Sequence, residues 1–123
     1  MFNLDLKDKV ILITGGSDGL GYASAELLSS EGAKVIICGR RGDYLSEKAK
    51  TISENTNNNV LAIQADVSKA EDCKRLVEET ISKFKKIDIL VNNAGASAAA
   101  LFENVSDKNW EDDINLKLMS TIR

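Results

Sequence analysis

The residues of this sequence that are best suited to binding a ligand form a glycine-rich turn at residues 14–21, which reads TGGSDGLG. It lies between an apolar, β-branched run and a segment with helical spacing. Such a turn leaves backbone N–H groups free at a helix N-terminus, where they can bind a phosphate or a pyrophosphate. We expect Gly15 to permit the tight turn, Gly19 to let backbone approach the ligand and Gly21 to bring the helix close to the sheet.

The other residues of the turn differ in chemistry. Ser17 can add a hydroxyl donor, and Leu20 lies where the backbone N–H groups are free. Asp18 is unusual, because a carboxylate beside a phosphate is electrostatically unfavourable. We favour a solvent-facing turn residue for Asp18, although its position keeps it among the candidate ligand contacts.

A second motif follows another apolar run. Residues 87–91 read IDILV, as in a buried strand, and Asn92-Asn93-Ala94-Gly95 comes directly after them. A glycine cluster alone is also compatible with a plain strand–turn–helix corner. The two motifs in this order resemble those of the short-chain dehydrogenase/reductase family, and the resemblance extends over residues 8–123. It implies an oxidoreductase that binds a nicotinamide dinucleotide.

The resemblance also implies how the second motif is used. Asn93, Ala94 and Gly95 would pass under the adenosine ribose with backbone contacts. Thr14 and Asn92 would mostly brace the turn between the two central strands.

A third motif, the pair Asp66-Val67, resembles the residues of the family that contact adenine. Asp66 would accept a hydrogen bond from the adenine amino group, and Val67 would pack on the ring. The alternative is that Asp66 is an ordinary turn or cap residue.

Cofactor choice is indicated at the end of the second predicted strand, which reads Cys38-Gly39-Arg40-Arg41. An acidic residue there accepts hydrogen bonds from the ribose 2′-hydroxyl of NAD, whereas an arginine binds the 2′-phosphate of NADP. Gly39 occupies the usual acidic position, and two guanidinium groups follow it. We therefore predict NADP(H) over NAD(H). The alternative is that Arg40 and Arg41 are ordinary solvated surface charges.

The family's catalytic group is a tyrosine, a lysine four residues later, a serine and a helix asparagine. Only the asparagine has a matching position here, Asn115; the alternative for it is a solvent-facing helix residue. Tyr44 and Lys48 have the tyrosine–lysine spacing but follow the second strand, at the adenine end of the site, so we expect a surface pair. Ser97 follows the fourth strand rather than the fifth and is not assigned as catalytic.

Alternating strand and helix patterns must position these residues. Leu20, Ala23, Leu27 and Leu28 have helical spacing after the first turn. Asp43 is expected to cap the second helix, Ser68 and Glu71 to form a capping box on the third, and Ser106 or Asp107 to open the last. The expected strands are residues 9–14, 34–38, 60–64 and 87–91, and the expected helices are 19–30, 43–54 and 69–84.

Repeated strand–helix units predict an α/β fold: a Rossmann-type, doubly wound parallel sheet with strand order 3-2-1-4. The crevice then lies between strands one and four, where both turns meet. We treat residues 1–123 as one NAD(P)-binding domain that is incomplete and truncated before the fifth strand, because family members are about twice this length. We therefore expect this chain alone to lack turnover.

Composition narrows the function classes. The net charge of −3 argues against nucleic acid as a main partner. The sequence has no histidine, which excludes zinc sites built on histidine and Ser-His-Asp hydrolysis. We expect no bound metal. Cys38 and Cys73 are expected to be free thiols, which fits the cytoplasm. No apolar run is long enough to span a membrane, and no signal peptide is evident.

The implied reaction is hydride transfer between NADP(H) and a small-molecule carbonyl or alcohol, carried out by the longer parent protein. Two alternatives are a nucleotide-binding module without chemistry and an interaction or dimerisation module. The last predicted helix carries Ile114, Leu118 and Met119, and members of the family commonly pair through this helix. We therefore expect a homo-oligomer.

Overall fold

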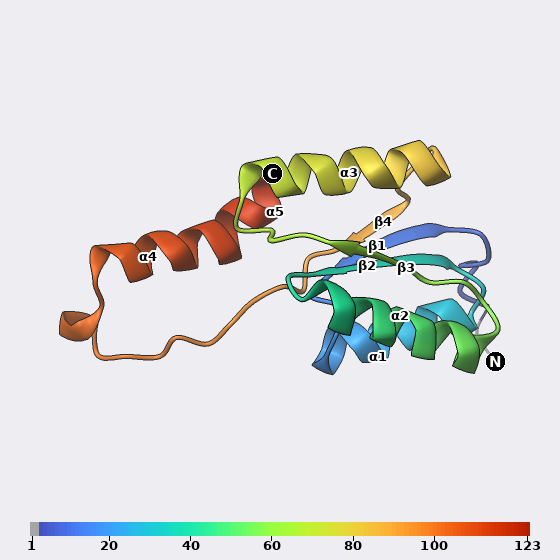
Figure 1. Cartoon of the computed structure of the whole chain (residues 1–123), viewed down its shortest axis with the longest axis horizontal. Coiled ribbons are helices and arrows are strands. Elements are labelled where there is room, and N and C mark those ends of the chain that lie inside the picture. Colours follow the sequence, from blue (N-terminus) through green and yellow to red (C-terminus); the bar gives the residue numbers. More distant parts are fainter. Residues whose placement is uncertain (1–2) are drawn as a thin grey trace.

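Four parallel strands form one sheet in the computed structural model, which describes residues 3–123 (Figure 1). Their order is β3-β2-β1-β4, so the predicted 3-2-1-4 topology is confirmed. Strand β1 pairs with β2 from Val10↔Lys34 to Thr14↔Cys38 and with β4 from Ile11↔Ile89 to Ile13↔Val91. The strands are β1 (Val10–Thr14), β2 (Lys34–Gly39), β3 (Leu61–Gln64) and β4 (Ile89–Val91).

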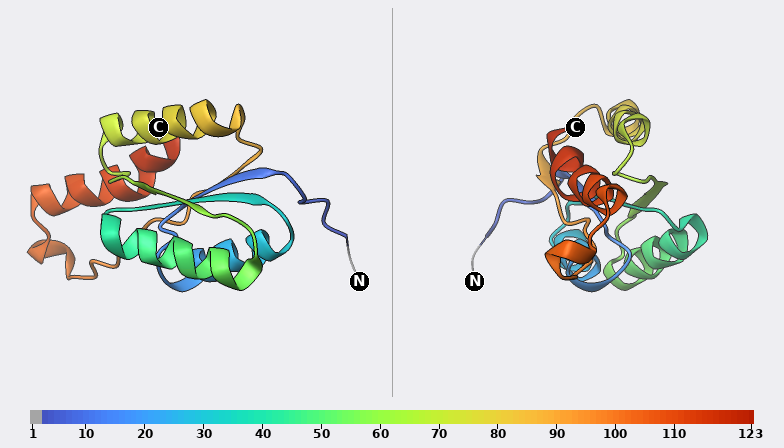
Figure 2. Two further views of the ribbon diagram at one scale, coloured as in Figure 1. Left: turned by 45° about the vertical axis from the view of Figure 1, so that its right-hand side comes forward. Right: turned by 90° about the vertical axis from the view of Figure 1, so that its left-hand side faces the viewer.

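Helices cover both faces of this sheet. Helices α1 (Gly19–Ser30) and α2 (Gly42–Thr56) lie on one face, and α3 (Ala70–Phe84) lies on the other (Figures 1 and 2). The chain after β4 runs away from the sheet and returns through a series of short helices. These are η1 (Phe102–Asn104), α4 (Asp107–Ile114), the π-helix η2 (Asn115–Met119) and α5 (Ser120–Ile122).

The core has two layers, because side chains alternate along each buried strand. Ile11 and Ile13 of β1 face α1 and α2, whereas Val10 and Leu12 face α3. Burial on both faces explains why the strands read as continuous apolar runs.

Helix α1 faces the sheet with small residues. Its buried residues are Gly21, Ala25 and Ser29. The helix expected from the spacing of Leu20 and Leu27 is present, but these two side chains lie outside the core and are 82% and 68% exposed. Small residues let the helix approach the strands closely, and this approach displaces the leucines to the outside.

Two expected helix caps are also wrong. Helix α2 begins after Arg41, so Asp43 lies within its first turn, and neither α2 nor α3 has a side-chain cap hydrogen bond. The expected capping box of Ser68 and Glu71 is absent from α3, whose N-cap is Lys69. Ser68 instead donates to the Asp66 carboxylate through both its backbone N–H and its hydroxyl.

The N-cap of α4 agrees with expectation, because Ser106 accepts a hydrogen bond from the Asn109 backbone N–H at 3.2 Å. Beyond α4 the chain returns to the sheet. Arg123 donates to the Ser68 carbonyl at 3.2 Å, and Leu116 packs on the core layer beneath α3. Across residues 3–123, the structure contains no helix that is both long and apolar enough to cross a membrane.

Candidate functional site

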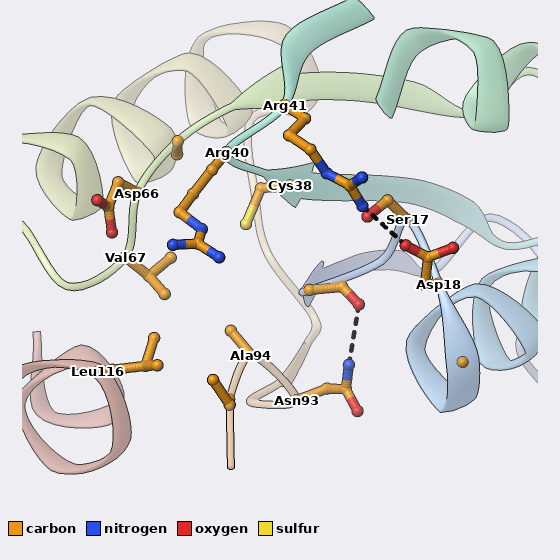
Figure 3. Close-up of a pocket in the computed structure, with 16 residues that line it drawn as sticks. Ser17, Asp18, Cys38, Arg40, Arg41, Asp66, Val67, Asn93, Ala94 and Leu116 are labelled. Carbon is orange, nitrogen blue, oxygen red and sulfur yellow. Dashed lines mark hydrogen bonds and ion pairs between the residues drawn. The ribbon is translucent and has the colours of Figure 1, made fainter. Parts of the chain in front are cut away.

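A cavity of about 320 Å³ lies at the carboxyl ends of the strands, where the turns after β1 and β4 meet (Figure 3). It brings together residues that are far apart in the sequence. Of the predicted cofactor contacts, the following line it: Gly15, Ser17, Asp18, Gly19, Arg40, Arg41, Asp66, Val67, Asn93, Ala94 and Gly95.

Leu20 and Gly21 do not line the cavity. The Leu20 side chain points to solvent, and Gly21 is buried at the base of the turn. A β-carbon on Gly21 would lie 2.2 Å from the Gly15 carbonyl oxygen and 2.5 Å from Nδ2 of Asn93. Gly21 therefore shapes the turn, because only hydrogen fits at this position.

The turn after β1 is held by the turn after β4. Thr14 Oγ1 accepts hydrogen bonds from the backbone N–H groups of Asn93 and Ala94, both at 3.0 Å. Asn93 in turn donates through Nδ2 to the carbonyl groups of Thr14 and Gly15, at 3.2 and 3.0 Å. The expectation that Thr14 and Asn92 brace this junction is thus correct for Thr14, but the asparagine that braces it is Asn93.

The start of α1, at the cavity-lining residue Gly19, has backbone N–H groups without partners in the helix. Its N-cap Asp18 has extended backbone and makes no side-chain cap hydrogen bond, and the first helical bond runs from the Tyr22 N–H to the Asp18 carbonyl. The N–H groups before Tyr22 have no partner within the helix. Gly15 makes the preceding turn possible, with φ at +68° and a β-carbon position 2.9 Å from the Ala94 Cα.

The two arginines after β2 have different surroundings. The Arg41 guanidinium forms an ion pair with Asp18 at 3.0 Å and lies 4.1 Å from the centre of the Tyr44 ring. The Arg40 side chain points the other way, toward Val67 (Figure 3). Within residues 3–123 Arg40 has no ion-pair partner, so its charge is available to a ligand.

The far side of the cavity is formed after β3. Asp66 Oδ1 accepts hydrogen bonds from Ser68 N and Ser68 Oγ, at 3.0 and 2.6 Å, so Asp66 does organise the local turn. It also lines the cavity, as does Val67. The two interpretations of Asp66 from the sequence are therefore compatible.

Several lining residues were not among the predicted contacts. These are Cys38, Gly39, Ala65, Ala96 and Leu116. Each lies next to a predicted site residue or is separated from one by a single residue in the sequence, as Leu116 follows Asn115, and this adjacency is the signal that could have found them.

The Cys38 thiol lies at the base of the cavity and is almost fully buried. Burial raises its pKa to about 11, so it stays neutral at physiological pH. Cys38 and Cys73 are both free and buried, as expected for thiols that do not form a disulfide. In the part of the chain that the structure describes, no group of three or more acidic, cysteine or histidine side chains is arranged to hold a metal.

Asn115 is the first residue of the π-helix η2 and is half-buried. Its neighbour Leu116 lines the cavity, whereas Asn115 does not, and Asn115 Oδ1 lies 3.5 Å from the Arg123 guanidinium. Single π-turns inside helices occur frequently at functional sites, because they redirect side chains and backbone carbonyls.

Tyr44 and Lys48 lie outside the cavity lining. The Tyr44 hydroxyl donates to Asp18 Oδ1 at 2.5 Å, and Lys48 Nζ lies 5.1 Å from the Tyr44 ring centre. The Tyr44 hydroxyl thus bonds to Asp18 beside the cavity, and Tyr44 does not line the cavity itself.

Comparisons with known proteins agree with this architecture. A family model described as short chain dehydrogenase matches residues 9–123. The 11-beta-hydroxysteroid dehydrogenase 1A of Arabidopsis thaliana is 42% identical over 107 residues, which cover 87% of this chain and 31% of the relative. An uncharacterized oxidoreductase of Staphylococcus saprophyticus is 38% identical over 119 residues, covering 97% of this chain and 51% of that protein.

Solved structures show the same likeness. The L-sorbose reductase of Gluconobacter frateurii, complexed with NADPH and L-sorbose, superposes with a TM-score of 0.95 at 34% identity, over 98% of this chain and 46% of that one. An NADH-dependent reductase complexed with NAD superposes with a TM-score of 0.88 at 33% identity, over 99% of this chain and 50% of that one. The chain therefore spans about half or less of the length of the proteins it matches.

Proposed function

Since this chain belongs to the short-chain dehydrogenase family, we propose that its cavity binds the adenosine and pyrophosphate portions of NADP(H). The single observation that supports this most is the meeting of three features at one cavity: the start of α1, the Asp66-Val67 pair and Arg40, which has no ion-pair partner among the described residues. The volume of about 320 Å³ is within the range of small-molecule sites and suits part of a dinucleotide.

Each part of the dinucleotide has a chemically matched partner in this proposal. The pyrophosphate lies against the N–H groups that precede Tyr22, where the helix dipole favours negative charge. The adenine amino group donates to Asp66, and the ring packs on Val67. Backbone of Asn93, Ala94 and Gly95 passes beneath the ribose.

The preference for NADP(H) rests on the end of β2. Gly39 offers no carboxylate to a ribose 2′-hydroxyl, and Arg40, which forms no ion pair within residues 3–123, offers its guanidinium to a 2′-phosphate. Relatives of known structure are complexed with NADPH in one case and with NAD in another, so membership of the family leaves this choice to the local residues.

For the whole protein we propose hydride transfer between the nicotinamide and a small carbonyl or alcohol. The cofactor, when bound, supplies or accepts the hydride, and the residues described here bind and orient it. Among residues 3–123, those lining the cavity include no tyrosine or lysine that could exchange a proton with a substrate oxygen. We therefore propose that these 123 residues bind the dinucleotide without turnover. Of the tyrosine, lysine, serine and asparagine that form the family's catalytic group, we propose that they supply only the asparagine, Asn115.

A second role, self-association, is supported by the exposed apolar stripe on the last helices. Ile114, Leu118 and Ile122 follow one another at four-residue spacing, and all three are exposed. We propose that a second copy of the chain covers this stripe. The two free, buried thiols fit a reducing compartment, and we propose the cytoplasm.

The test of the main proposal is a fluorescence titration of the 123-residue chain with NADPH and with NADH. Arg40→Ala is expected to weaken NADPH binding by about 10- to 100-fold, because a charge-assisted contact to phosphate is lost, and to change NADH binding by less than about twofold. Lys50→Ala, which removes the same charge from the exposed face of α2, is the matched control. An equal loss of affinity for both dinucleotides would show that Arg40 does not read the 2′-phosphate.

A further inference from the structure

Asp18 lies at the mouth of the cavity and is the one acidic residue of the phosphate-binding turn. We propose that Asp18 is a specificity-determining residue, whose carboxylate lowers the preference of this site for a dinucleotide that carries a 2′-phosphate. This inference rests on the proposed function of the cavity as a dinucleotide site.

Two hydrogen bonds hold the Asp18 carboxylate in position. Asp18 Oδ2 accepts from the Arg41 guanidinium at 3.0 Å, and Oδ1 accepts from the Tyr44 hydroxyl at 2.5 Å. The Arg41 guanidinium in turn lies over the Tyr44 ring. We call these three residues the Asp18 network; it joins the start of α1 to the start of α2 across the edge of the cavity.

The network makes the two adjacent arginines unequal. Arg41 is drawn toward Asp18 and Ser17, whereas Arg40 points toward Val67 (Figure 3). The positive charge of Arg41 is thus largely offset by Asp18, which leaves Arg40 as the arginine of the cavity that has no ion-pair partner within residues 3–123. A count of two arginines in the sequence therefore overstates the attraction for a phosphate.

A bound 2′-phosphate meets Asp18 in two ways. It competes with the carboxylate for Arg41, and it carries a like charge near that carboxylate. Both effects raise the dissociation constant for NADPH and act little on NADH, which lacks the 2′-phosphate. Because the pair is exposed, each effect is moderate and is screened by salt.

Asp18→Asn isolates this charge with little change of shape. The amide oxygen can still accept from Tyr44 or Arg41, so the network keeps a hydrogen bond while the negative charge is removed. Asp43→Asn is the matched control, because Asp43 lies on the exposed side of the first turn of α2 and does not line the cavity.

The experiment measures dissociation constants of NADPH and NADH for the 123-residue chain and both variants, at ionic strengths of about 0.01 M and about 1 M. For Asp18→Asn at low salt, we expect NADPH to bind about three- to tenfold more tightly and NADH to change by less than about twofold. The gain is expected to shrink at high salt, where the Debye length falls to about 3 Å. Asp43→Asn should leave the ratio of the two constants within about twofold.

The outcomes separate the two proposals. If the unmodified chain binds neither dinucleotide, the proposed function is wrong, and this inference fails with it. If the chain binds NADPH but Asp18→Asn leaves the NADPH-to-NADH ratio unchanged or lowers it, the inference alone is overturned. An equal gain in Asp43→Asn also overturns it, because the effect then reflects net charge rather than the position of Asp18.

Discussion

Asn93 Nδ2 donates a hydrogen bond to the carbonyl oxygen of Gly15, 3.0 Å away, and so fastens the turn after β4 directly to the turn after β1. These two turns are 78 residues apart in the sequence. Their junction forms one wall of the cavity, which means that the stability of this contact and the shape of the ligand site are coupled.

Asn93→Ala should therefore destabilise the chain by about 1–2 kcal/mol, because two partly buried carbonyl groups lose their donor. It should also weaken binding of both dinucleotides by similar factors, since the wall is common to both. Urea unfolding and parallel titrations with NADPH and NADH measure these effects. Asn59→Ala, at an exposed position, is the control, and an equal loss of stability there would contradict the bracing role.

Gly21→Ala should cost about 2–3 kcal/mol or more, because its β-carbon would lie 2.2 Å from backbone oxygen that cannot move without opening the turn. Gly95→Ala is the contrasting variant, since its β-carbon would meet nothing within 4 Å, and it should change stability by less than about 0.5 kcal/mol. The midpoint of thermal unfolding distinguishes the two. Similar midpoints for both variants would mean that α1 can shift away from the turn.

Because of the buried Cys38 thiol, we predict that the free energy of unfolding falls at alkaline pH. Burial raises the pKa of its thiol from the ordinary 9.0 to about 11 in the folded chain. Between these values the unfolded chain has released the proton and the folded chain has kept it, so the free energy of unfolding falls as pH rises from 9 to 11. The loss amounts to about 2–3 kcal/mol and is complete above pH 11.

The measurement is urea unfolding across this pH range, compared with Cys38→Ala. The variant should be less stable at neutral pH, because it leaves a small void, but its stability should fall less steeply between pH 9 and 11. Subtracting the two curves removes the contributions of tyrosine and lysine. Parallel curves would show that the thiol is not held neutral by its surroundings.

We predict that the chain self-associates through the exposed apolar stripe formed by Ile114, Leu118 and Ile122. Leu118 is 54% exposed, and Leu118→Glu places a charge in the middle of the stripe. Light scattering over a range of concentrations should show association of the unmodified chain and a mass near the monomer value of 13.4 kDa for the variant. Asn59→Glu adds the same charge at a distant exposed position and should leave association unchanged; dissociation by both variants would point to net charge instead.

Much of the fold could be predicted because its signals are local. The apolar run ending at Thr14 and the glycines that follow it specify a buried strand and a tight turn within a few residues of chain. The same is true of β2, β3 and the run before Asn92, and the observed strands differ from the predicted ones only at their ends. The order of the strands followed from the handedness and short connections of strand–helix units.

Features that depend on competition between neighbours could not be predicted. Ser68 has the residue type of a helix cap, but its hydroxyl is oriented toward the Asp66 carboxylate, to which it donates, and the helix begins one residue later than a Ser68 cap requires, after Lys69. Leu20 and Leu27 have helical spacing, yet the residues of α1 that are buried against the sheet are the smaller Gly21, Ala25 and Ser29.

The sequence alone determined the chemistry available at the sheet edge: backbone donors at a glycine turn, an aspartate–valine pair and two adjacent arginines. Tertiary structure decided how these groups are shared. Asp18 and Tyr44 are 26 residues apart, and only packing of α1 beside α2 brings them together and draws Arg41 toward them. Residue type limits which contacts a side chain can make, but the free energy of a charge depends on which partners the folded chain places within a few ångströms of it.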